Sequence, residues 1–311
     1  MIVGAGRAGS RHAQAALRVP EVELVGFYDT DRGRAESLAL AFGGSVFSEL
    51  PSAPVASLAV ICTPPATHAN LARMALAAGC HVLVEKPFSL DTASIEEIDH
   101  IACRVGLFVG AVAQHRFSAD ARLLRTLVQA SSLGQVNRVE VAVQRFRSSD
   151  YFADRSADWR QSRSGGGGVL ISVGFHYLDL ACWIVGPPSD ARAILHERIN
   201  GVDSFISGTF GLGTSAATVT ARWGEVAVRP DTLRILCAQG NLELTGDKLR
   251  EGGSGEHVSR AELHARQLRD LVAAIREGRR PFVTPSDVKA ALVTIFAMYE
   301  SAGCLERERP C

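Results

Sequence analysis

The stretch Met1-Ile-Val-Gly4-Ala-Gly6-Arg-Ala-Gly9, together with Asp29, decides the fold class of this 311-residue chain. An apolar segment precedes the glycines and a helical pattern follows them. Glycines at these spacings permit a tight turn and bring backbone N–H groups close to a pyrophosphate at a helix N-terminus. Asp29 lies 20 residues after Gly9, the expected distance to an acid that binds the adenosine ribose. The alternative is a glycine-rich turn of purely structural origin. We predict a nicotinamide dinucleotide site formed by Gly4, Gly6, Arg7, Ala8, Gly9 and Asp29.

The identity of the dinucleotide depends on the acid at the end of the second apolar run. A carboxylate at Asp29 would repel a 2′-phosphate, so it favours NAD over NADP. Arg32 and Arg34 weaken that preference, because either side chain could reach the ribose edge. The apolar segment before Gly4 has three residues, which is short for a strand. We therefore expect the natural start to lie upstream of Met1, or this form to be truncated.

Apolar runs and helical patterns alternate through the first third of the chain. Strands are predicted at residues 1–3, 22–28, 57–62, 81–84 and 107–113, and helices at residues 8–18, 32–42, 68–78 and 92–104. Such alternation with short links is typical of a doubly wound parallel sheet with right-handed crossovers. We predict an α/β protein with a Rossmann domain at residues 1–118.

The pattern changes after residue 118, where longer strand-like runs appear. These runs cover residues 136–147, 204–211, 214–223, 232–238 and 241–244, and helical patterns cover residues 119–130, 175–185, 261–277 and 286–301. This arrangement predicts a second, α+β domain at residues 119–311 with a mostly antiparallel sheet.

The composition excludes several classes of function. The 33 basic residues balance 33 acidic ones, so the chain lacks the polycationic signature of nucleic-acid or anionic-membrane binding. No stretch approaches the roughly 18 apolar residues of a membrane span, and the first residues do not show a basic segment followed by an apolar core, so we expect no secretory signal. We expect a cytoplasmic protein. Seven scattered cysteines, none in a CxxC pair, indicate neither a disulfide framework nor a zinc site. The histidines show no metal-ligand spacing, and we expect His257 and His264 at the surface.

Lysine is rare in this sequence. It occurs only at Lys86, Lys248 and Lys289, among 33 basic residues. A lysine ammonium can change its pKa when buried and take part in proton chemistry, whereas arginine stays protonated. The alternative is that a high-GC genome favours arginine codons and the three lysines are accidental.

Three further segments carry a family resemblance. They are Cys62-Thr-Pro-Pro-Ala-Thr-His68, Gly79-Cys-His-Val-Leu-Val-Glu85-Lys86-Pro87 and Ser164-Gly-Gly-Gly-Gly-Val-Leu-Ile-Ser172-Val-Gly174-Phe-His176-Tyr-Leu-Asp179. With residues 275–281 and 299–302 they resemble the glucose–fructose oxidoreductase/inositol dehydrogenase (Gfo/Idh/MocA) family over nearly the whole chain. The resemblance implies an N-terminal Rossmann domain and a C-terminal substrate domain on an open, mainly antiparallel sheet. That sheet often forms the oligomer interface, so a homodimer or homotetramer is expected.

The resemblance also implies roles for particular residues near the cofactor. Glu85 and Lys86 are expected near the nicotinamide ribose, and Thr63, Pro64 and His68 are expected to line the cofactor cleft. Arg116, Tyr151, Trp159 and Arg160 lie in segments that flank the substrate in relatives. For the two arginines the alternative is a surface position, which is usual for this residue type.

Reversible oxidation of a sugar or cyclitol is the usual chemistry of the family. A hydroxyl proton must leave as hydride leaves the same carbon, so the implied acid/base His176 and the ammonium of Lys86 suit the reaction. A positive Lys86 nearby would keep His176 a neutral base. Asp179 is a candidate that supports His176 or the substrate. Its alternative is a solvated helix position or a cap partner.

One position departs from the family pattern. Four residues before His176, where the family commonly has an aspartate, this chain has Ser172. On a helical turn Ser172 and His176 share a face, so the serine can hydrogen-bond a substrate hydroxyl but cannot act as a carboxylate base. In the family, uncharged residues here occur in members that act on nucleotide-linked sugars.

We therefore predict an NAD(P)-dependent dehydrogenase or ketoreductase acting on a secondary alcohol or ketone of a sugar, nucleotide sugar or cyclitol. Two alternatives remain open. One is a glycosidase that retains NAD and works by transient oxidation and elimination. The other is a non-catalytic dinucleotide-binding regulator.

Overall fold

The computed structural model describes residues 1–50, 55–148, 151–152, 155–224, 230–250, 253–254 and 258–304. The chain divides into two compact units. Unit 1 comprises Met1–Phe117 and Val258–Lys289, and unit 2 comprises Ser118–His257 and Ala290–Cys311. The chain first passes from unit 1 to unit 2 after Phe117, one residue from the expected boundary at residue 118. Residues 258–289, which we assigned to the second domain from the sequence, return to unit 1.

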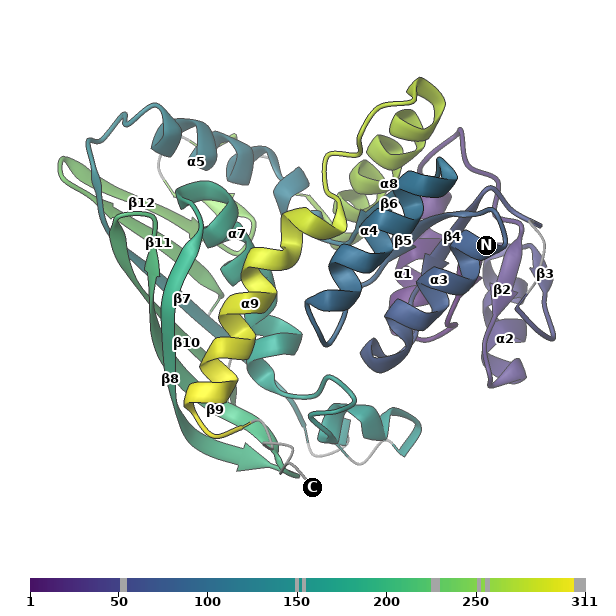
Figure 1. Ribbon diagram of the computed structural model, residues 1–311, viewed down its shortest axis with the longest axis horizontal. Coiled ribbons are helices and arrows are strands. Elements are labelled where there is room, and N and C mark those ends of the chain that lie inside the picture. The colour runs from purple at the N-terminus through teal and green to yellow at the C-terminus, as the bar shows by residue number, and fades with distance from the viewer. Residues whose placement is uncertain are drawn as a thin grey trace. The chain divides into compact units, whose positions relative to one another are not determined.

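Unit 1 is built on a six-stranded parallel sheet with the order β3-β2-β1-β4-β5-β6 (Figure 1). Its strands are β1 (Ile2–Val3), β2 (Gly26–Tyr28), β3 (Ser45–Val46), β4 (Leu58–Ile61), β5 (His81–Val84) and β6 (Val109–Ala111). Every pairing is parallel. This order, with the reversal between β1 and β4, is that of the predicted Rossmann fold. The short strand β3 was not predicted.

Helices cover both faces of this sheet. They are α1 (Arg7–Ala16), α2 (Arg32–Phe42), α3 (His68–Ala77), α4 (Ala93–Val105) and α8 (Arg260–Glu277). Successive residues of a strand point to opposite faces. Accordingly, Ile2 packs in one cluster with Ala13 of α1 and Leu268 of α8, and Val3 packs in another with Leu71 of α3. The doubly wound arrangement is therefore confirmed.

Unit 2 is built on a seven-stranded sheet with the order β13-β12-β11-β7-β10-β9-β8. Its strands are β7 (Val136–Phe146), β8 (Pro188–Ile199), β9 (Val202–Leu212), β10 (Ser215–Gly224), β11 (Thr232–Cys237), β12 (Gly240–Thr245) and β13 (Lys248–Leu249). Only the pairing of β7 with β10 is parallel; the other described pairings are antiparallel. The predicted mostly antiparallel sheet is confirmed, although β8 was missed.

The two faces of the unit 2 sheet differ in polarity. Val139 and Val141 of β7 and Val219 of β10 are buried. The helices α5 (Ala119–Gln129) and α7 (Phe175–Val185) pack against this sheet, and α9 (Pro285–Ser301) begins in unit 1 and continues into unit 2 (Figure 1). Intervening residues carry ion pairs, such as Arg222 with Glu197 at 3.1 Å. The expected oligomer interface on this sheet stays a prediction.

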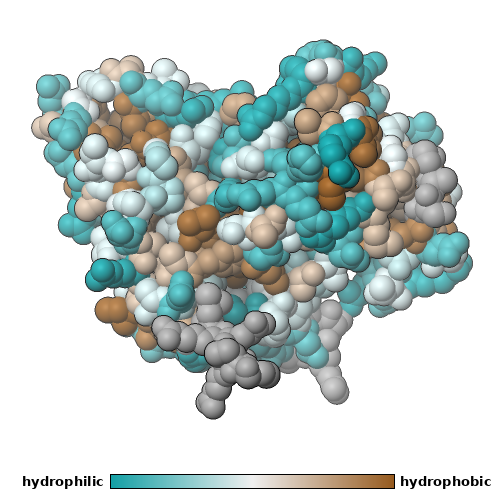
Figure 2. Space-filling view, in the orientation of Figure 1, coloured by the Kyte–Doolittle hydropathy of each residue, from teal (hydrophilic) through white to brown (hydrophobic). Residues whose placement is uncertain are grey.

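The surface mixes polar and apolar side chains. Figure 2 shows hydrophobic residues in several separate patches among hydrophilic ones. None of the helices in the described part of the chain is long and apolar enough to cross a membrane.

Candidate functional site

The candidate cofactor residues of unit 1 follow the carboxyl ends of neighbouring strands. Gly4 follows β1, Asp29 follows β2, Thr63 comes shortly after β4, and Glu85 follows β5. Parallel strands end at the same edge of a sheet, and the strand order reverses between β1 and β4. Ligands of doubly wound sheets bind at such a switch point.

The glycine turn has two tightly packed positions and one open one. Gly4 has a φ of +99°, and a β-carbon there would lie 2.7 Å from the backbone of Cys62 and Thr63. A β-carbon on Gly9 would lie 2.1 Å from the carbonyl oxygen of Gly4. A β-carbon on Gly6 would meet no atom within 4 Å beyond its own surroundings in the chain. Gly6 also precedes α1 without any side-chain cap. The turn thus leaves space and backbone N–H donors at the helix N-terminus, which fits a pyrophosphate.

Asp29 is held beside this turn by backbone donors. Its Oδ2 accepts a hydrogen bond from the Ala5 N–H at 2.7 Å, and its Oδ1 accepts one from the Asp31 N–H at 2.8 Å. The two arginines that could reach the ribose edge contact nearby acids. Arg32 pairs with Glu36 at 2.7 Å, and Arg34 pairs with Asp31 at 3.2 Å.

His68 is buried rather than exposed to a cleft. Its side chain is 1% exposed, and its two ring nitrogens lie 2.8 Å from the carbonyl oxygens of Pro87 and Thr63. Burial lowers the pKa of His68, although both carbonyls oppose that shift. Thr63 and Pro64 are accessible, with Thr63 Oγ1 2.7 Å from Thr67 Oγ1. In this geometry His68 connects the Thr63 loop to the residue after Lys86.

Glu85 lies at the centre of a buried polar group. Its Oε1 lies 3.1 Å from His12 Nε2 of α1, and its Oε2 accepts the Lys86 N–H at 2.9 Å. The ring of His264 from α8 lies 4.6 Å from the ring of His12. Burial would raise the pKa of Glu85, but the hydrogen bond and charge of His12 and the charges of His264 and Lys86 hold it well below its usual range. Glu85 is therefore an ionised carboxylate beside Lys86.

Sequence reasoning missed His12 and His264. His264 was expected at the surface but is 3% exposed, so that expectation is wrong. Ligand atoms of His12, Glu85 and His264 lie within 4.8 Å of one another, a grouping that could hold a metal ion. Linear spacing could not reveal it, because the three residues come from distant segments. The available signal was His12 itself, a histidine in the helix that directly follows the glycines, where it is buried.

The candidate residues of unit 2 begin in a π-helical segment. Leu170–Gly174 forms a π-helical turn that continues into α7 at Phe175. Ser172 lies in this turn and His176 lies in the first turn of α7; both are partly exposed. Single π turns are frequent at functional sites. Ser172 and His176 thus lie on one continuous helical segment, and the prediction that their side chains share a face stays a prediction.

A buried polar trio holds the start of that segment. Asp203 Oδ2 accepts the Leu170 N–H at 2.9 Å, and the Tyr299 hydroxyl accepts the Ile171 N–H at 3.1 Å. Arg163 Nη1 lies 2.8 Å from Asp203 Oδ1, and its guanidinium lies 3.6 Å from the Tyr299 ring centroid. These contacts tie the glycine run to β9 and α9.

Three of the expected substrate residues come together in unit 2. The Arg160 guanidinium lies 4.7 Å from the ring centroid of Tyr151 and 5.5 Å from that of Trp159. Arg147 lies 4.5 Å from the same Tyr151 ring, and Trp223 packs edge-on at 6.2 Å. Cationic and aromatic groups thus form one partly exposed cluster.

Two further residues expected near the substrate, Asp179 and Arg116, are buried. Asp179 is 2% exposed, so the alternative of a solvated helix position is wrong. Arg116 is 3% exposed in unit 1, and its Nη2 donates to the carbonyl oxygen of Asp287 at 2.8 Å. Arg116 therefore is not the surface residue that its alternative predicted.

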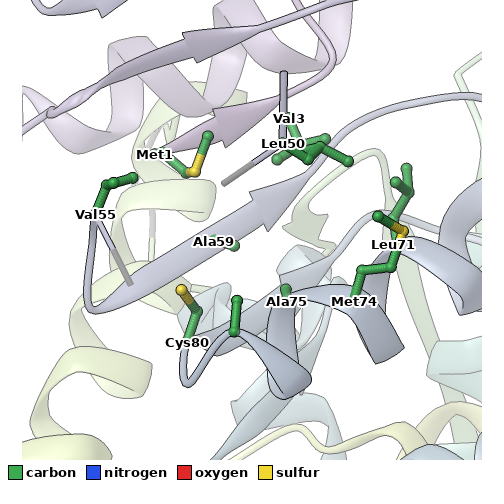
Figure 3. Close-up of a pocket in the computed structure, with 10 residues that line it drawn as sticks. Met1, Val3, Leu50, Val55, Ala59, Leu71, Met74, Ala75 and Cys80 are labelled. Atoms are coloured by element: carbon green, nitrogen blue, oxygen red, sulfur yellow. The ribbon is translucent and has the colours of Figure 1, made fainter. Parts of the chain in front are cut away.

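An apolar hollow of about 30 Å³ lies elsewhere in unit 1 (Figure 3). Met1, Val3, Leu71, Met74 and Cys80 are among the residues that line it. It lies on the face of the sheet covered by α3, away from the glycine turn. Its lining offers no charged side chain among the described residues, so it does not serve the chemistry predicted above.

Comparisons with known proteins agree on one family. Residues 1–111 match the GFO/IDH/MocA family model described as oxidoreductase family, NAD-binding Rossmann fold. Residues 121–243 match the model of the GFO/IDH/MocA C-terminal domain.

Named relatives match part of the chain. A D-glucoside 3-dehydrogenase of Escherichia coli is 29% identical over 202 residues, which are 63% of this chain and 56% of that protein. A UDP-N-acetylglucosamine 3-dehydrogenase of Acidithiobacillus ferrooxidans is 31% identical over 201 residues, 62% of this chain and 56% of that protein. The matched region therefore spans little more than half the length of these relatives.

Solved structures show the same fold. The WlbA dehydrogenase from Bordetella pertussis, solved with NADH and UDP-GlcNAcA, superposes with a TM-score of 0.87. The two chains are 22% identical, and the match covers 97% of this chain and 94% of that one.

Proposed function

Because the chain belongs to the GFO/IDH/MocA oxidoreductase family, we propose that it is an NAD-dependent dehydrogenase or ketoreductase of a sugar or nucleotide sugar. The observation that carries the proposal is the conjunction of two features at one edge of the unit 1 sheet. One is the open glycine turn at Gly6 with Asp29 beside it. The other is the largely buried Glu85 carboxylate that precedes Lys86.

NAD is the dinucleotide that these residues suit. Backbone N–H groups at the start of α1 would bind the pyrophosphate, where the helix dipole also favours negative charge. Asp29 would accept hydrogen bonds from the ribose hydroxyls and repel a 2′-phosphate. Arg32 and Arg34 do not decide between the two dinucleotides, because their ion pairs with Glu36 and Asp31 are solvent-exposed and weak.

The proton chemistry is assigned to His176 and Lys86. Bound NAD supplies the hydride acceptor for a carbinol carbon. In the oxidative direction the neutral imidazole of His176 takes the hydroxyl proton, and the Lys86 ammonium donates a hydrogen bond to the same oxygen as negative charge develops on it. In the reductive direction His176 returns the proton. Ser172 would hydrogen-bond a neighbouring hydroxyl, and it adds no second carboxylate base.

The position oxidised is proposed from the relatives. Two proteins similar to this chain are named as 3-dehydrogenases, one of a D-glucoside and one of UDP-N-acetylglucosamine. We propose that the 3-hydroxyl of a hexopyranoside is the reacting group here. The cluster of Arg147, Arg160 and Tyr151 supports an anionic substituent, such as a diphosphate or carboxylate, on that sugar.

The test is a screen of free sugars, glycosides, sugar phosphates, polyols and UDP- or dTDP-sugars with NAD and NADP, followed by reduced-nicotinamide absorbance. Lys86→Met and His176→Ala should each lower kcat by about 10²–10⁴-fold and leave NADH binding within a few-fold of wild type. Lys248→Met, at an exposed lysine of unit 2, is the matched control and should match wild type. Near-normal kcat in either site variant would refute the assignment. Glycoside hydrolysis without net cofactor turnover would identify the glycosidase alternative instead.

A further inference from the structure

Three buried histidines surround the segment Glu85-Lys86-Pro87 in unit 1. They are His12 of α1, His68 of α3 and His264 of α8, and their exposures are 2%, 1% and 3%. Histidine is seldom wholly buried unless its ring meets hydrogen-bonding or packing partners. Three such residues around one short segment indicate that its geometry is held from several sides.

Hydrogen bonds hold the segment before and after Lys86. Before it, the Glu85 carboxylate joins His12 Nε2, at 3.1 Å, to the Lys86 N–H, at 2.9 Å. After it, the Pro87 carbonyl lies 2.8 Å from His68 Nδ1, whose ring also lies 2.8 Å from the Thr63 carbonyl. The backbone of Lys86 is therefore connected to α1 on one side and to the β4 loop on the other.

His264 contacts the ring of His12, and through that ring it affects the hydrogen bond between His12 and Glu85. The two ring centroids lie 4.6 Å apart with an interplanar angle of 61°, an edge-to-face contact. His264 is placed firmly, because Gln267, one turn further along α8, bonds the Ala113 N–H at 3.2 Å and the Ala111 carbonyl at 2.7 Å. The ring of His264 thus limits how His12 can turn.

We propose that His12 and His264 are positioning residues that orient Lys86. His12 donates a hydrogen bond to the largely buried Glu85 carboxylate, His264 packs against the His12 ring, and Glu85 fixes the Lys86 backbone. This inference rests on the proposed function, in which the Lys86 ammonium donates a hydrogen bond to the reacting oxygen. A buried carboxylate that loses its donor must rearrange or take up a proton. Misplacement of a reacting group by about 1 Å can cost roughly 10²-fold in rate.

Hydrogen bonding explains the cluster better than a metal ion does. The contact of 3.1 Å between Glu85 and His12 has the length of a hydrogen bond. The ligand atoms of His12, Glu85 and His264 lie within 4.8 Å of one another, a spacing that by itself would also allow an ion. The positive charge of Lys86 also acts on Glu85, which disfavours a further cation. The hydrogen-bond and metal explanations make different demands on residue 264. Packing against His12 requires only an aromatic ring there, whereas metal binding requires a ring nitrogen.

Matched variants separate the hydrogen bond from mere packing. His12→Leu removes the donor, whereas His12→Gln can place an amide N–H near the position of Nε2. His264→Phe retains a ring and His264→Ala removes it. His81→Leu is the control, because His81 begins β5 and accepts the Phe108 N–H at 3.0 Å, at the end of the strand opposite to Lys86. We expect kcat to fall about 10²-fold in His12→Leu and to stay within about threefold of wild type in His12→Gln, His264→Phe and His81→Leu.

A second readout does not depend on activity. The chain has three lysines, so reductive ¹³C-methylation gives three lysine NMR signals, assigned by single Lys→Arg replacements. In His12→Leu and His264→Ala the Lys86 signal should shift or broaden while those of Lys248 and Lys289 stay in place. In His12→Gln, His264→Phe and His81→Leu all three should keep their positions.

Two results would overturn the inference. One is a Lys86 signal in folded His12→Leu that matches wild type. The other is stoichiometric zinc or another divalent metal in the purified wild-type protein that is lost in both His12→Leu and His264→Phe. If no sugar is turned over by the wild type, the proposed function fails, but the lysine signals still decide whether these histidines orient Lys86.

Discussion

Replacement of His264 by phenylalanine should make unfolding less sensitive to acid. Burial, followed by the charge of His12, lowers the pKa of His264 from 6.5 to about 3 in the folded chain. Its folded form is therefore neutral where the unfolded form takes up a proton. The resulting stability is complete above the unfolded pKa near 6.5 and is lost progressively as pH falls toward the folded value. His264→Phe removes the titrating group and retains the ring.

The magnitude follows from the shift. One proton bound only by the unfolded chain changes the free energy of unfolding by about 1.4 kcal/mol per pH unit. Between pH 7.5 and pH 5 the wild type should thus lose about 2 kcal/mol more than His264→Phe. At a urea m-value of about 2 kcal/mol/M this is a difference of about 1 M in the shift of the midpoint.

The assay is urea unfolding at pH 7.5, 6.5, 5.5 and 5.0, followed by far-UV circular dichroism. Tryptophan fluorescence reports on unit 2, because Trp159, Trp183 and Trp223 all lie there. The circular dichroism signal reports on both units, so comparing it with the fluorescence signal identifies the unfolding transition of unit 1. Equal acid sensitivity of wild type and His264→Phe would refute the reasoning, since it would mean that His264 titrates alike in both states.

Four further outcomes are expected from single replacements. Gly6→Ala should keep wild-type thermal stability but weaken NADH binding in fluorescence titrations, because a β-carbon there occupies only the space left for the pyrophosphate. Gly9→Ala should instead destabilise the fold, because its β-carbon would lie 2.1 Å from a backbone oxygen. Asp29→Ser should raise the NADP-to-NAD ratio of kcat/KM by about tenfold or more, because a repelling charge is removed; an unchanged ratio would exclude Asp29 from that role. Tyr299→Phe should cost about 1–3 kcal/mol in urea unfolding, because the buried Ile171 N–H loses its acceptor at 3.1 Å; a cost near zero would show that this bond is dispensable.

Much of unit 1 could be predicted because its signals are local. The predicted helices at residues 32–42 and 68–78 agree with α2 and α3 to within one residue. The apolar runs between these helices predicted strands that are buried on both faces, which indicated a sheet covered by helices on both sides. The strand β3 was missed because it has two residues and little apolar character. The return of α8 to unit 1 was missed because its partners, α1 and the β6 region, are more than 140 positions earlier in the chain.

Only those residues of the candidate site that belong to short sequence motifs could be predicted. Gly4, Asp29 and Glu85 were recognisable from spacing or resemblance, since each belongs to a short contiguous pattern. His264 was misplaced, because a helix near a glycine-rich segment gives no sign of which face it buries. Asp203 and Tyr299 were not candidates at all, although they hold the π-helical turn, because a side chain that supports another from 96 residues away leaves no linear signature.

Each unit presents one of the two proposed reacting groups from a turn that buried polar side chains hold. In unit 1 these are His12, Glu85 and His264, and in unit 2 they are Asp203 and Tyr299 with Arg163. Burial of such groups costs free energy that an apolar core would not incur, so stability alone does not account for them. Hydrogen bonds are directional, whereas apolar packing tolerates rotation of a side chain. The two polar groups are therefore best understood as a means of fixing where Lys86 and His176 are presented, at the expense of some stability in each unit.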